Sequence, residues 1–246
     1  MAIRAVVFDM GNTLTHFVGD WYTVRTAGMA ALVEFYAGVG IALDGAALLE
    51  ALMTASGEGG KRTLERQVQI STTEALKQAL RTVGAPAEAD DYISAALWHY
   101  HTPESAAWVA VPGALETLAA LSARGYLLGA FSNAPDDSMV QRQVDLCGYR
   151  RYLSPVFTSA GMGYFKPRRE VFALFPLYWD VLAEEIVMVG DVLQFDVVGA
   201  QAVGMRTIWT RQLELTQWNT AHYDQIVPDA EVRDIRDVVD VIAGWG

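Results

Sequence analysis

Three aspartates stand just beyond two short apolar runs that lie far apart in the sequence. Asp9 follows the apolar run 3–8, and Asp191 and Asp196 follow the run 186–189. Open α/β sheets build their sites at the carboxyl ends of buried strands, so carboxylates at these positions are candidates for chemistry. A carboxylate can attack phosphorus as a nucleophile, and several carboxylates together can hold a divalent cation.

A serine and a lysine fall at two further expected strand ends between these aspartates. Ser132 and Asn133 follow the run 126–131, and Lys166 follows the run 155–158 at some distance. Taken singly, each polar residue has an ordinary explanation, as a helix N-cap, a turn or a solvated side chain. Four of them at the ends of successive strands predict one shared site.

The strands and helices that must position these residues can be predicted from the hydrophobic pattern of the sequence. Short runs of near-continuous apolarity are typical of strands that are covered on both faces, and helical patterns separate them. Such alternation predicts an α/β fold with a doubly wound parallel sheet and right-handed crossovers. The expected strands are 3–8, 126–131, 155–158, 186–189 and 206–209, with helices over 115–121, 172–177 and 199–203.

Residues 17–108 interrupt this alternation with helical periodicity and no convincing strand. We expect four helices, with breaks at 38–40, 57–60 and 84–86, where glycine or proline cluster. A run of helices after the first strand predicts a helical cap domain over the carboxyl edge of the sheet. The predicted division is a core of 1–16 and 109–246 and a cap of 17–108. The expected cap helices are 21–36, 45–55, 63–83 and 88–100.

Four stretches, in order, resemble the motifs of the haloacid dehalogenase (HAD) superfamily, in its capped (C1-type) subfamily. The first is Asp-Met-Gly-Asn-Thr at 9–13, and the second is the strand that ends in Ser132. Lys166 matches the lysine of the third, and Gly-Asp at 190–191 matches the fourth. The resemblance covers the whole chain. It implies a Rossmann-like core with an inserted cap, and a magnesium-dependent phosphatase that acts on a small phosphorylated metabolite.

The resemblance also implies roles at the metal. Asp9 would be the nucleophile that forms an aspartyl-phosphate. Mg²⁺ would bind the carboxylates of Asp9 and Asp191 and the backbone carbonyl of Gly11. Asp196 would belong to the same metal site, in its outer shell or as the partner of Lys166. Mg²⁺ suits such a site because it accepts a few carboxylate and carbonyl oxygens and also binds phosphate.

The remaining matched residues would face the phosphate. Ser132 and the backbone amide of Asn133 would hydrogen-bond the phosphoryl oxygens, and Lys166 would neutralise both Asp9 and the phosphate. Preorganised charges of this kind supply most of the catalysis in phosphoryl transfer.

One position departs from the family pattern. Gly11 stands where most phosphatases of this group have a second aspartate, the general acid that protonates the leaving group. General acid catalysis is typically worth ~10²–10⁴-fold in rate. In one interpretation the chain remains a phosphatase, and water, Thr13 or His16 assists the proton. A histidine one residue past such a motif is more often a loop-packing or surface residue than a catalyst, so loop packing is the favoured interpretation of His16.

Two other interpretations stay open. In the second interpretation the chemistry has changed to that of a 2-haloacid dehalogenase, although those enzymes tend to have an aromatic residue at the position of Gly11, or to that of a phosphonatase, with Lys61 as a cap lysine. In the third interpretation turnover is lost and the fold only binds a metabolite. Lys61 and Arg62 follow the glycines at 57–60, and this stretch is either a plain linker or a substrate-specificity loop.

Composition limits the partners and the compartment. The 246 residues are 52% apolar and 19% charged, which is typical of a globular protein with a sizeable core. A formal net charge of −11 argues against nucleic acid and membrane surfaces as partners. No apolar stretch reaches the roughly 18 residues of a membrane span. The lone cysteine, Cys147, excludes an internal disulfide and is expected to pack as a small hydrophobe. We expect a cytoplasmic protein without a signal peptide, since the first strand begins almost at once.

Overall fold

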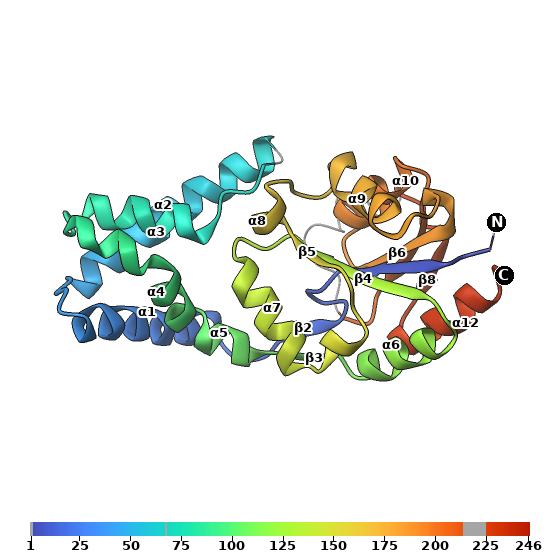
Figure 1. The fold of residues 1–246 in the computed structure, drawn as a ribbon, viewed down its shortest axis with the longest axis horizontal. Coiled ribbons are helices and arrows are strands. Elements are labelled where there is room, and N and C mark those ends of the chain that lie inside the picture. Colours follow the sequence, from blue (N-terminus) through green and yellow to red (C-terminus); the bar gives the residue numbers. More distant parts are fainter. Residues whose placement is uncertain (1, 67, 214–224) are drawn as a thin grey trace.

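Six parallel strands form the central sheet of the computed structural model, which describes residues 2–66, 68–213 and 225–246 (Figure 1). Their order across the sheet is β5-β4-β1-β6-β7-β8, and every neighbouring pair is parallel. In chain order they are β1 Ala5–Phe8, β4 Leu127–Ser132, β5 Val156–Thr158, β6 Ile186–Gly190, β7 Arg206–Thr210 and β8 Ala230–Val232.

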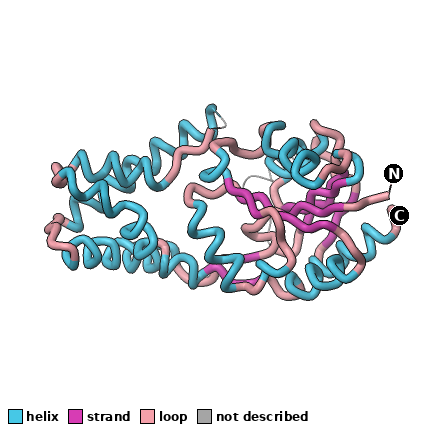
Figure 2. Tube along the Cα trace, viewed as in Figure 1, coloured by secondary structure: helices cyan, strands magenta, loops and turns pink. Residues whose placement is uncertain are grey.

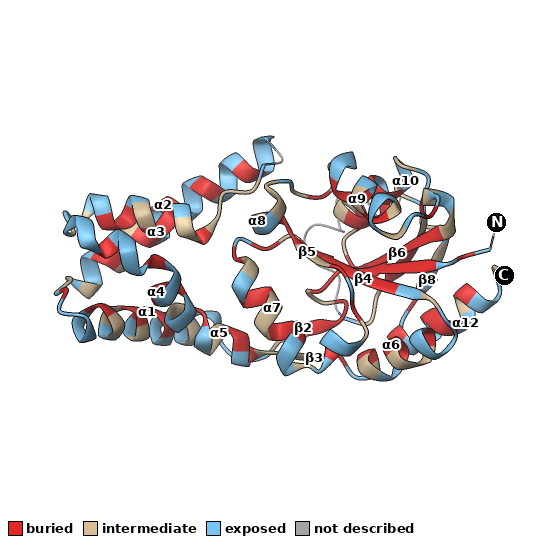
Figure 3. Cartoon of the chain, in the orientation of Figure 1, coloured by how far each residue is buried: buried red, intermediate tan, exposed pale blue. Residues whose placement is uncertain are grey.

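Helices cover both faces of this sheet, so the predicted doubly wound α/β fold is confirmed (Figure 1). Each face has its own apolar cluster, one beneath α6, α7 and α12 and the other beneath α9 and α10. The central strands are buried along almost their whole length (Figure 3). The core helices are α6 Ala114–Ala123, α7 Asp137–Leu146, α8 Ser159–Met162, α9 Arg169–Trp179, α10 Val198–Gln201 and α12 Val238–Ala243.

The apolar runs locate the strands well. All five expected strands are present, each within about two residues of the predicted bounds. The sixth, β8, pairs with β7 at the edge of the sheet and was not predicted from its three residues.

The region between β2 and β3 is helical throughout, as the sequence pattern predicts (Figure 2). It has an apolar cluster of its own, which includes Leu32, Tyr36, Leu48 and Leu76. α1 ends at Gly38 and α3 ends just before Gly84, at two of the predicted breaks. The helices are α1 Trp21–Gly38, α2 Gly45–Arg66, α3 Thr72–Thr82, α4 Ile93–Tyr100 and α5 Thr102–Ala107, with a 3₁₀ turn at Ala87–Tyr92.

The predicted break at 57–60 is wrong, because these residues lie inside α2, which continues to Arg66. The predicted helix 63–83 is therefore wrong at its start, because α2 ends at Arg66 and α3 begins at Thr72. Residue 67, between these helices, lies outside the described residues. Gly59 is buried, and a Cβ atom there would lie 3.0 Å from Cγ2 of Ile70. This glycine allows the segment before α3 to pack against α2, rather than ending the helix.

Two short strands join the helical region to the sheet. β2 (Thr15–Phe17) pairs antiparallel with β3 (Trp108–Ala110), so the chain leaves and re-enters through one ribbon. Phe17 and Trp108, at the two predicted domain boundaries, are register partners. The division into a core of 1–16 and 109–246 and a cap of 17–108 remains our prediction, and both predicted boundaries fall within this ribbon. Among the described residues, no helix combines the length and apolarity that crossing a membrane requires.

Candidate active site

The three predicted aspartates meet at the carboxyl edge of the sheet. Asp9 follows β1, and its backbone N–H still donates to the carbonyl of Val189 in β6, at 2.8 Å. Asp191 follows β6 directly. Carboxylate oxygens of Asp9, Asp191 and Asp196 lie within 4.8 Å of one another, and all three residues are at most 8% exposed. The aspartates that follow the two distant apolar runs therefore lie together at one edge of the sheet.

Lys166 lies against this cluster and is 1% exposed. Its Nζ donates to Oδ1 of Asp9 and to Oδ1 of Asp196, both at 2.6 Å, and to the carbonyl of Phe131 at 3.2 Å. An ammonium group has three N–H donors, so all three are engaged here. These bonds place the positive charge of Lys166 beside Asp9 and restrain the Asp9 carboxylate.

Asn133 fixes the backbone that presents Lys166. Its side-chain oxygen accepts from the Lys166 N–H at 2.8 Å, and its side-chain nitrogen donates to the Lys166 carbonyl at 3.1 Å. Sequence reasoning considered only the backbone amide of Asn133, so this positioning role of its side chain was missed. Ser132, at the end of β4, is 8% exposed and lines the same cavity.

Local backbone features place Asp191 and Asp196. A Cβ atom at residue 190 would lie 2.3 Å from Cγ of Asp196, so only glycine there lets Asp196 fold back onto the end of β6. Oδ2 of Asp196 then accepts from the Val192 N–H at 3.0 Å. Asn12 adopts a left-handed conformation, with φ of 58°, and its side chain donates to Oδ2 of Asp191 at 3.4 Å. Asparagine tolerates that conformation better than most residues do.

The cluster has more negative charge than Lys166 can balance. Burial raises the pKa of Asp9 to about 6, with Lys166 opposing the rise and Asp196 adding to it. Burial, together with the charges of Asp9 and Asp196, raises the pKa of Asp191 well above its ordinary value. Burial disfavours the charged form of Lys166, but Asp196 and Asp9 outweigh it, and the pKa of Lys166 is raised. Oxygen-rich, acidic and short of positive charge, this group of residues fits a divalent cation.

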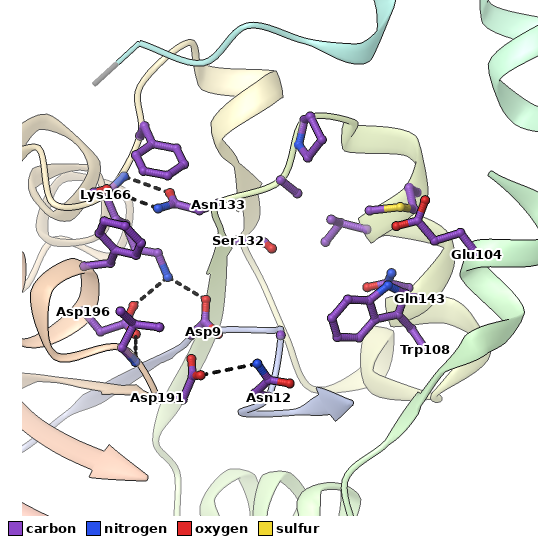
Figure 4. Close-up of a pocket in the computed structure, with 18 of the residues that line it drawn as sticks. Asp9, Asn12, Glu104, Trp108, Ser132, Asn133, Gln143, Lys166, Asp191 and Asp196 are labelled. Carbon is purple, nitrogen blue, oxygen red and sulfur yellow. Dashed lines mark hydrogen bonds and ion pairs between the residues drawn. The ribbon is translucent and has the colours of Figure 1, made fainter. Parts of the chain in front are cut away.

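The cluster forms one wall of a cavity of about 620 Å³ (Figure 4). Ser132 lies on the side of Asp9, whereas Glu104, Trp108 and Gln143 line the opposite side. Gly11 also lines the cavity. The volume suits a small metabolite. The site therefore has an acidic end for reaction and a distinct far wall.

Gly11 faces an aromatic side chain that sequence reasoning did not place there. A Cβ atom on Gly11 would lie 3.5 Å from Cη2 of Trp108, an ordinary contact distance. Trp108 packs edge-on against Phe17 and Trp21, which stack on each other at 3.7 Å. The space beside the missing acid is thus bounded by the indole of Trp108.

The other candidates from the sequence lie away from the cavity. Thr13 is fully buried, and both the Thr13 hydroxyl and His16 Nδ1 are buried without a hydrogen-bond partner among the described residues. Neither residue lines the cavity of Asp9, and within the described parts of the chain Lys61 does not line it either. Lys61 and Arg62 are exposed on α2, so the expected loop at 57–60 does not exist. Cys147 is half-buried against the core, and burial raises the pKa of its thiol.

Comparison with known proteins identifies the family. Residues 3–204 match the family model of the haloacid dehalogenase-like hydrolases. The chain belongs to this family. The predicted family and fold are thereby confirmed, and the fold matches a crystal structure of a 2-haloacid dehalogenase from Pseudomonas syringae pv. Tomato. That match has a TM-score of 0.71 at 24% identity and covers 99% of this chain and 100% of the other.

Two relatives align with most of this haloacid dehalogenase-like chain. A glyceraldehyde 3-phosphate phosphatase of Methanopyrus kandleri is 28% identical over 98% of this chain and 97% of its own length. A ribulose-1,5-bisphosphate 5-phosphatase of Halopiger xanaduensis is 30% identical over 83% of both chains. Both are named as phosphatases, and the dehalogenase likeness at 24% identity shows the fold alone.

Proposed function

We propose that this protein is a metal-dependent phosphomonoester hydrolase that acts on a small phosphorylated metabolite. The observation that supports it most is the buried meeting of Asp9, Asp191 and Asp196 with Lys166 at one edge of the sheet. Such a site has a carboxylate nucleophile, oxygen ligands for a cation and a buried ammonium. The phosphatase names of two relatives that align over most of the chain support the same activity.

In the proposed reaction Asp9 attacks phosphorus and holds the phosphoryl group as an aspartyl-phosphate, which water then hydrolyses. Lys166 restrains Asp9 through the 2.6 Å contact and offsets its charge. Ser132 and the backbone N–H of Asn133 would hydrogen-bond the phosphoryl oxygens. These steps divide one difficult hydrolysis into two displacements at phosphorus, in which Asp9 displaces the alcohol and water then displaces Asp9.

Mg²⁺ is the cation we propose for the acidic cluster. Asp9, Asp191 and the carbonyl of Gly11 would hold it, with Asp196 behind them bound to Lys166 and to the Val192 N–H. Bound there, the ion would lower the charge repulsion between an anionic nucleophile and an anionic phosphate. We also propose that the protein works in the cytoplasm, since its single cysteine suits a reducing compartment.

The test is phosphate release by the purified protein with Mg²⁺. We expect p-nitrophenyl phosphate to be cleaved faster than alkyl phosphates, because its leaving group needs little protonation and Gly11 supplies no acid. Asp9→Asn should abolish release, whereas Asp91→Asn, at an exposed site in the cap region, should not change it. Unchanged release by Asp9→Asn would show that the nucleophile is another residue.

A 2-haloacid dehalogenase is the second candidate, favoured by the absence of an acid at Gly11. Chloride release from 2-chloropropionate without added metal would support it over a phosphatase. A metabolite-binding protein without turnover is the remaining possibility from the sequence. For such a protein, binding of a phosphorylated compound would raise the melting temperature, and no phosphorylated compound would be hydrolysed.

A further inference from the structure

The far wall of the cavity contains polar groups that the proposed reaction does not use. Glu104 comes from α5 and Gln143 from α7, and both lie across the cavity from Asp9 (Figure 4). Trp21 and Trp108 line the cavity beside them. A phosphoryl group held at Asp9 would turn the organic part of its ester toward this wall.

Glu104 is held in place by a buried histidine. Nδ1 of His101 lies 3.2 Å from Oε2 of Glu104, and the His101 side chain is 5% exposed. Nε2 of His101 lies 3.8 Å from Oδ2 of Asp136, at the start of α7. Oε1 of Glu104 has no hydrogen bond to any residue that the structure describes. One oxygen is therefore anchored, and the other is available to a molecule in the cavity.

The side-chain amide of Gln143 is also available to a molecule in the cavity. The residue is 3% exposed, yet its side-chain amide makes no hydrogen bond within residues 2–66, 68–213 and 225–246. Buried amides in folded proteins are nearly always hydrogen-bonded. A buried amide that lines a cavity and lacks a protein partner is placed to bind a ligand there.

We infer that Glu104 and Gln143 select phosphate esters whose organic part has hydroxyl or ammonium donors, and reject esters that have a carboxylate. This inference rests on the proposed function. An ionised carboxylate only accepts hydrogen bonds, so Glu104 pairs with a donor, while the Gln143 amide both donates and accepts. The faces of Trp21 and Trp108 would pack against the carbon atoms between the phosphate and that donor.

The negative charge of Glu104 on the far wall disfavours phosphate esters that have a carboxylate. A second carboxylate on the substrate would lie near the negative charge of Glu104. Among the described residues that line this cavity, the one cationic side chain is Lys166, whose three N–H donors are engaged at the acidic end. Glu104, Trp108 and Gln143 therefore offer a carboxylate no positive charge, and like charges at close range oppose binding.

The test compares three esters: glycerol 3-phosphate with hydroxyls, phosphoethanolamine with an ammonium and phosphoglycolate with a carboxylate. For the unchanged protein with Mg²⁺ we expect kcat/KM for at least one donor ester to exceed that for phosphoglycolate about tenfold or more. The first two esters distinguish a hydroxyl from an ammonium as the donor. Glu104→Gln should lower the ratio of donor ester to phosphoglycolate about 10- to 100-fold, the value of a hydrogen bond to a charged group. The glutamine can still accept from His101, so the anchor is kept.

Glu58→Gln is the matched control, because it removes the same charge from an exposed position on α2 and should leave the ratio unchanged. Gln143→Leu is the second variant, in case Glu104→Gln does not fold, and it should also lower kcat/KM for the preferred donor ester. A ratio that Glu104→Gln and Gln143→Leu leave unchanged would overturn the inference while turnover of p-nitrophenyl phosphate upholds the proposed function. Failure of every phosphate ester would overturn both.

Discussion

Gly11 supplies no carboxyl group that could act as a general acid for Asp9, the proposed nucleophile, although the site has room for one. A Cβ atom there would meet the Trp108 ring at 3.5 Å, a normal contact, so an aspartate needs only a small movement of the indole. We predict that Gly11→Asp raises kcat for alkyl phosphates about tenfold or more, within the ~10²–10⁴-fold that a general acid can supply. The rate with p-nitrophenyl phosphate should change much less.

Gly11→Asn is the matched control for this substitution. It has the same size and shape but no transferable proton. Steady-state rates of the two variants with propyl phosphate compare them directly. Equal gains in both would mean that packing against Trp108, rather than proton transfer, limits the unchanged protein.

Burial of the acidic cluster should also make the stability of the metal-free protein depend on pH. Asp9 has a pKa of about 6 in the folded chain, raised from 3.8 chiefly by burial. A carboxyl group whose pKa is higher in the folded state than in the unfolded state contributes stability that is fully present below its unfolded pKa. This stability is lost as pH rises through its folded pKa. Ionised Asp9 therefore destabilises the metal-free protein above about pH 6. Asp9→Asn removes this charge and should stabilise the metal-free protein at pH 8 by up to about 3 kcal/mol, at 1.36 kcal/mol for each pKa unit.

Thermal unfolding in a chelator, from pH 5 to pH 8, measures this effect. The advantage of Asp9→Asn should grow from pH 5 to about pH 7 and then level off, whereas the exposed Asp91→Asn should show no such trend. Added Mg²⁺ should stabilise the unchanged protein more than Asp9→Asn. A constant difference at every pH would mean that the Asp9 carboxyl does not titrate as its burial requires.

At the scale of elements, the glycines of α2 differ in what they contact. Gly57 has no atom within 4 Å of an added Cβ, and Gly59 has Ile70 at 3.0 Å. Because glycine costs a helix interior roughly 0.5–1 kcal/mol relative to alanine, Gly57→Ala should stabilise the protein by about that amount. Gly59→Ala should gain less or destabilise, since Ile70 must move. Chemical denaturation of the two variants side by side measures the difference. A destabilised Gly57→Ala would contradict a continuous helix at 57–60.

The central strands β1, β4 and β6 were predictable because each is a continuous apolar run with a polar residue at or just after its end. That pattern located Asp9, Ser132 and Asp191 from sequence alone. The three-residue strands β2, β3 and β8 are too short to show a period. Gly59 was misread because its contact, Ile70, lies beyond one helix turn in the chain, and glycine by itself does not distinguish a break from a close approach.

The far wall of the site was not predictable from sequence for a related reason. Glu104, Trp108 and Gln143 come from a short helix, a ribbon strand and a core helix, and none follows a strand of the main sheet. Their convergence depends on how the helical region folds back over the sheet. Local pattern contains no information about that angle.

At the scale of the whole molecule, the helical region contacts the core at a second place besides the β2–β3 ribbon. The segment before α3 lies against the loops that follow β4 and β5 (Figure 1). The Gln69 N–H donates to the Gly163 carbonyl at 3.1 Å, and the Ser159 hydroxyl donates to Oε1 of Gln69 at 2.7 Å. The Thr72 N–H donates to the Pro135 carbonyl at 2.8 Å. These bonds hold the helical region against the core next to the loop of Lys166.

We predict that Gln69→Ala loosens this second contact while both folded regions stay intact, because each has its own apolar cluster. A neutral hydrogen bond contributes about 0.5–1.5 kcal/mol, so amide hydrogen exchange of residues 68–72 should become about 2- to 10-fold faster. KM for small phosphate esters should rise, since the cavity between the two regions closes less often. Gln78→Ala, at an exposed position on α3, is the control. Exchange as slow in Gln69→Ala as in Gln78→Ala would mean that the ribbon alone fixes the helical region over Asp9 and Lys166.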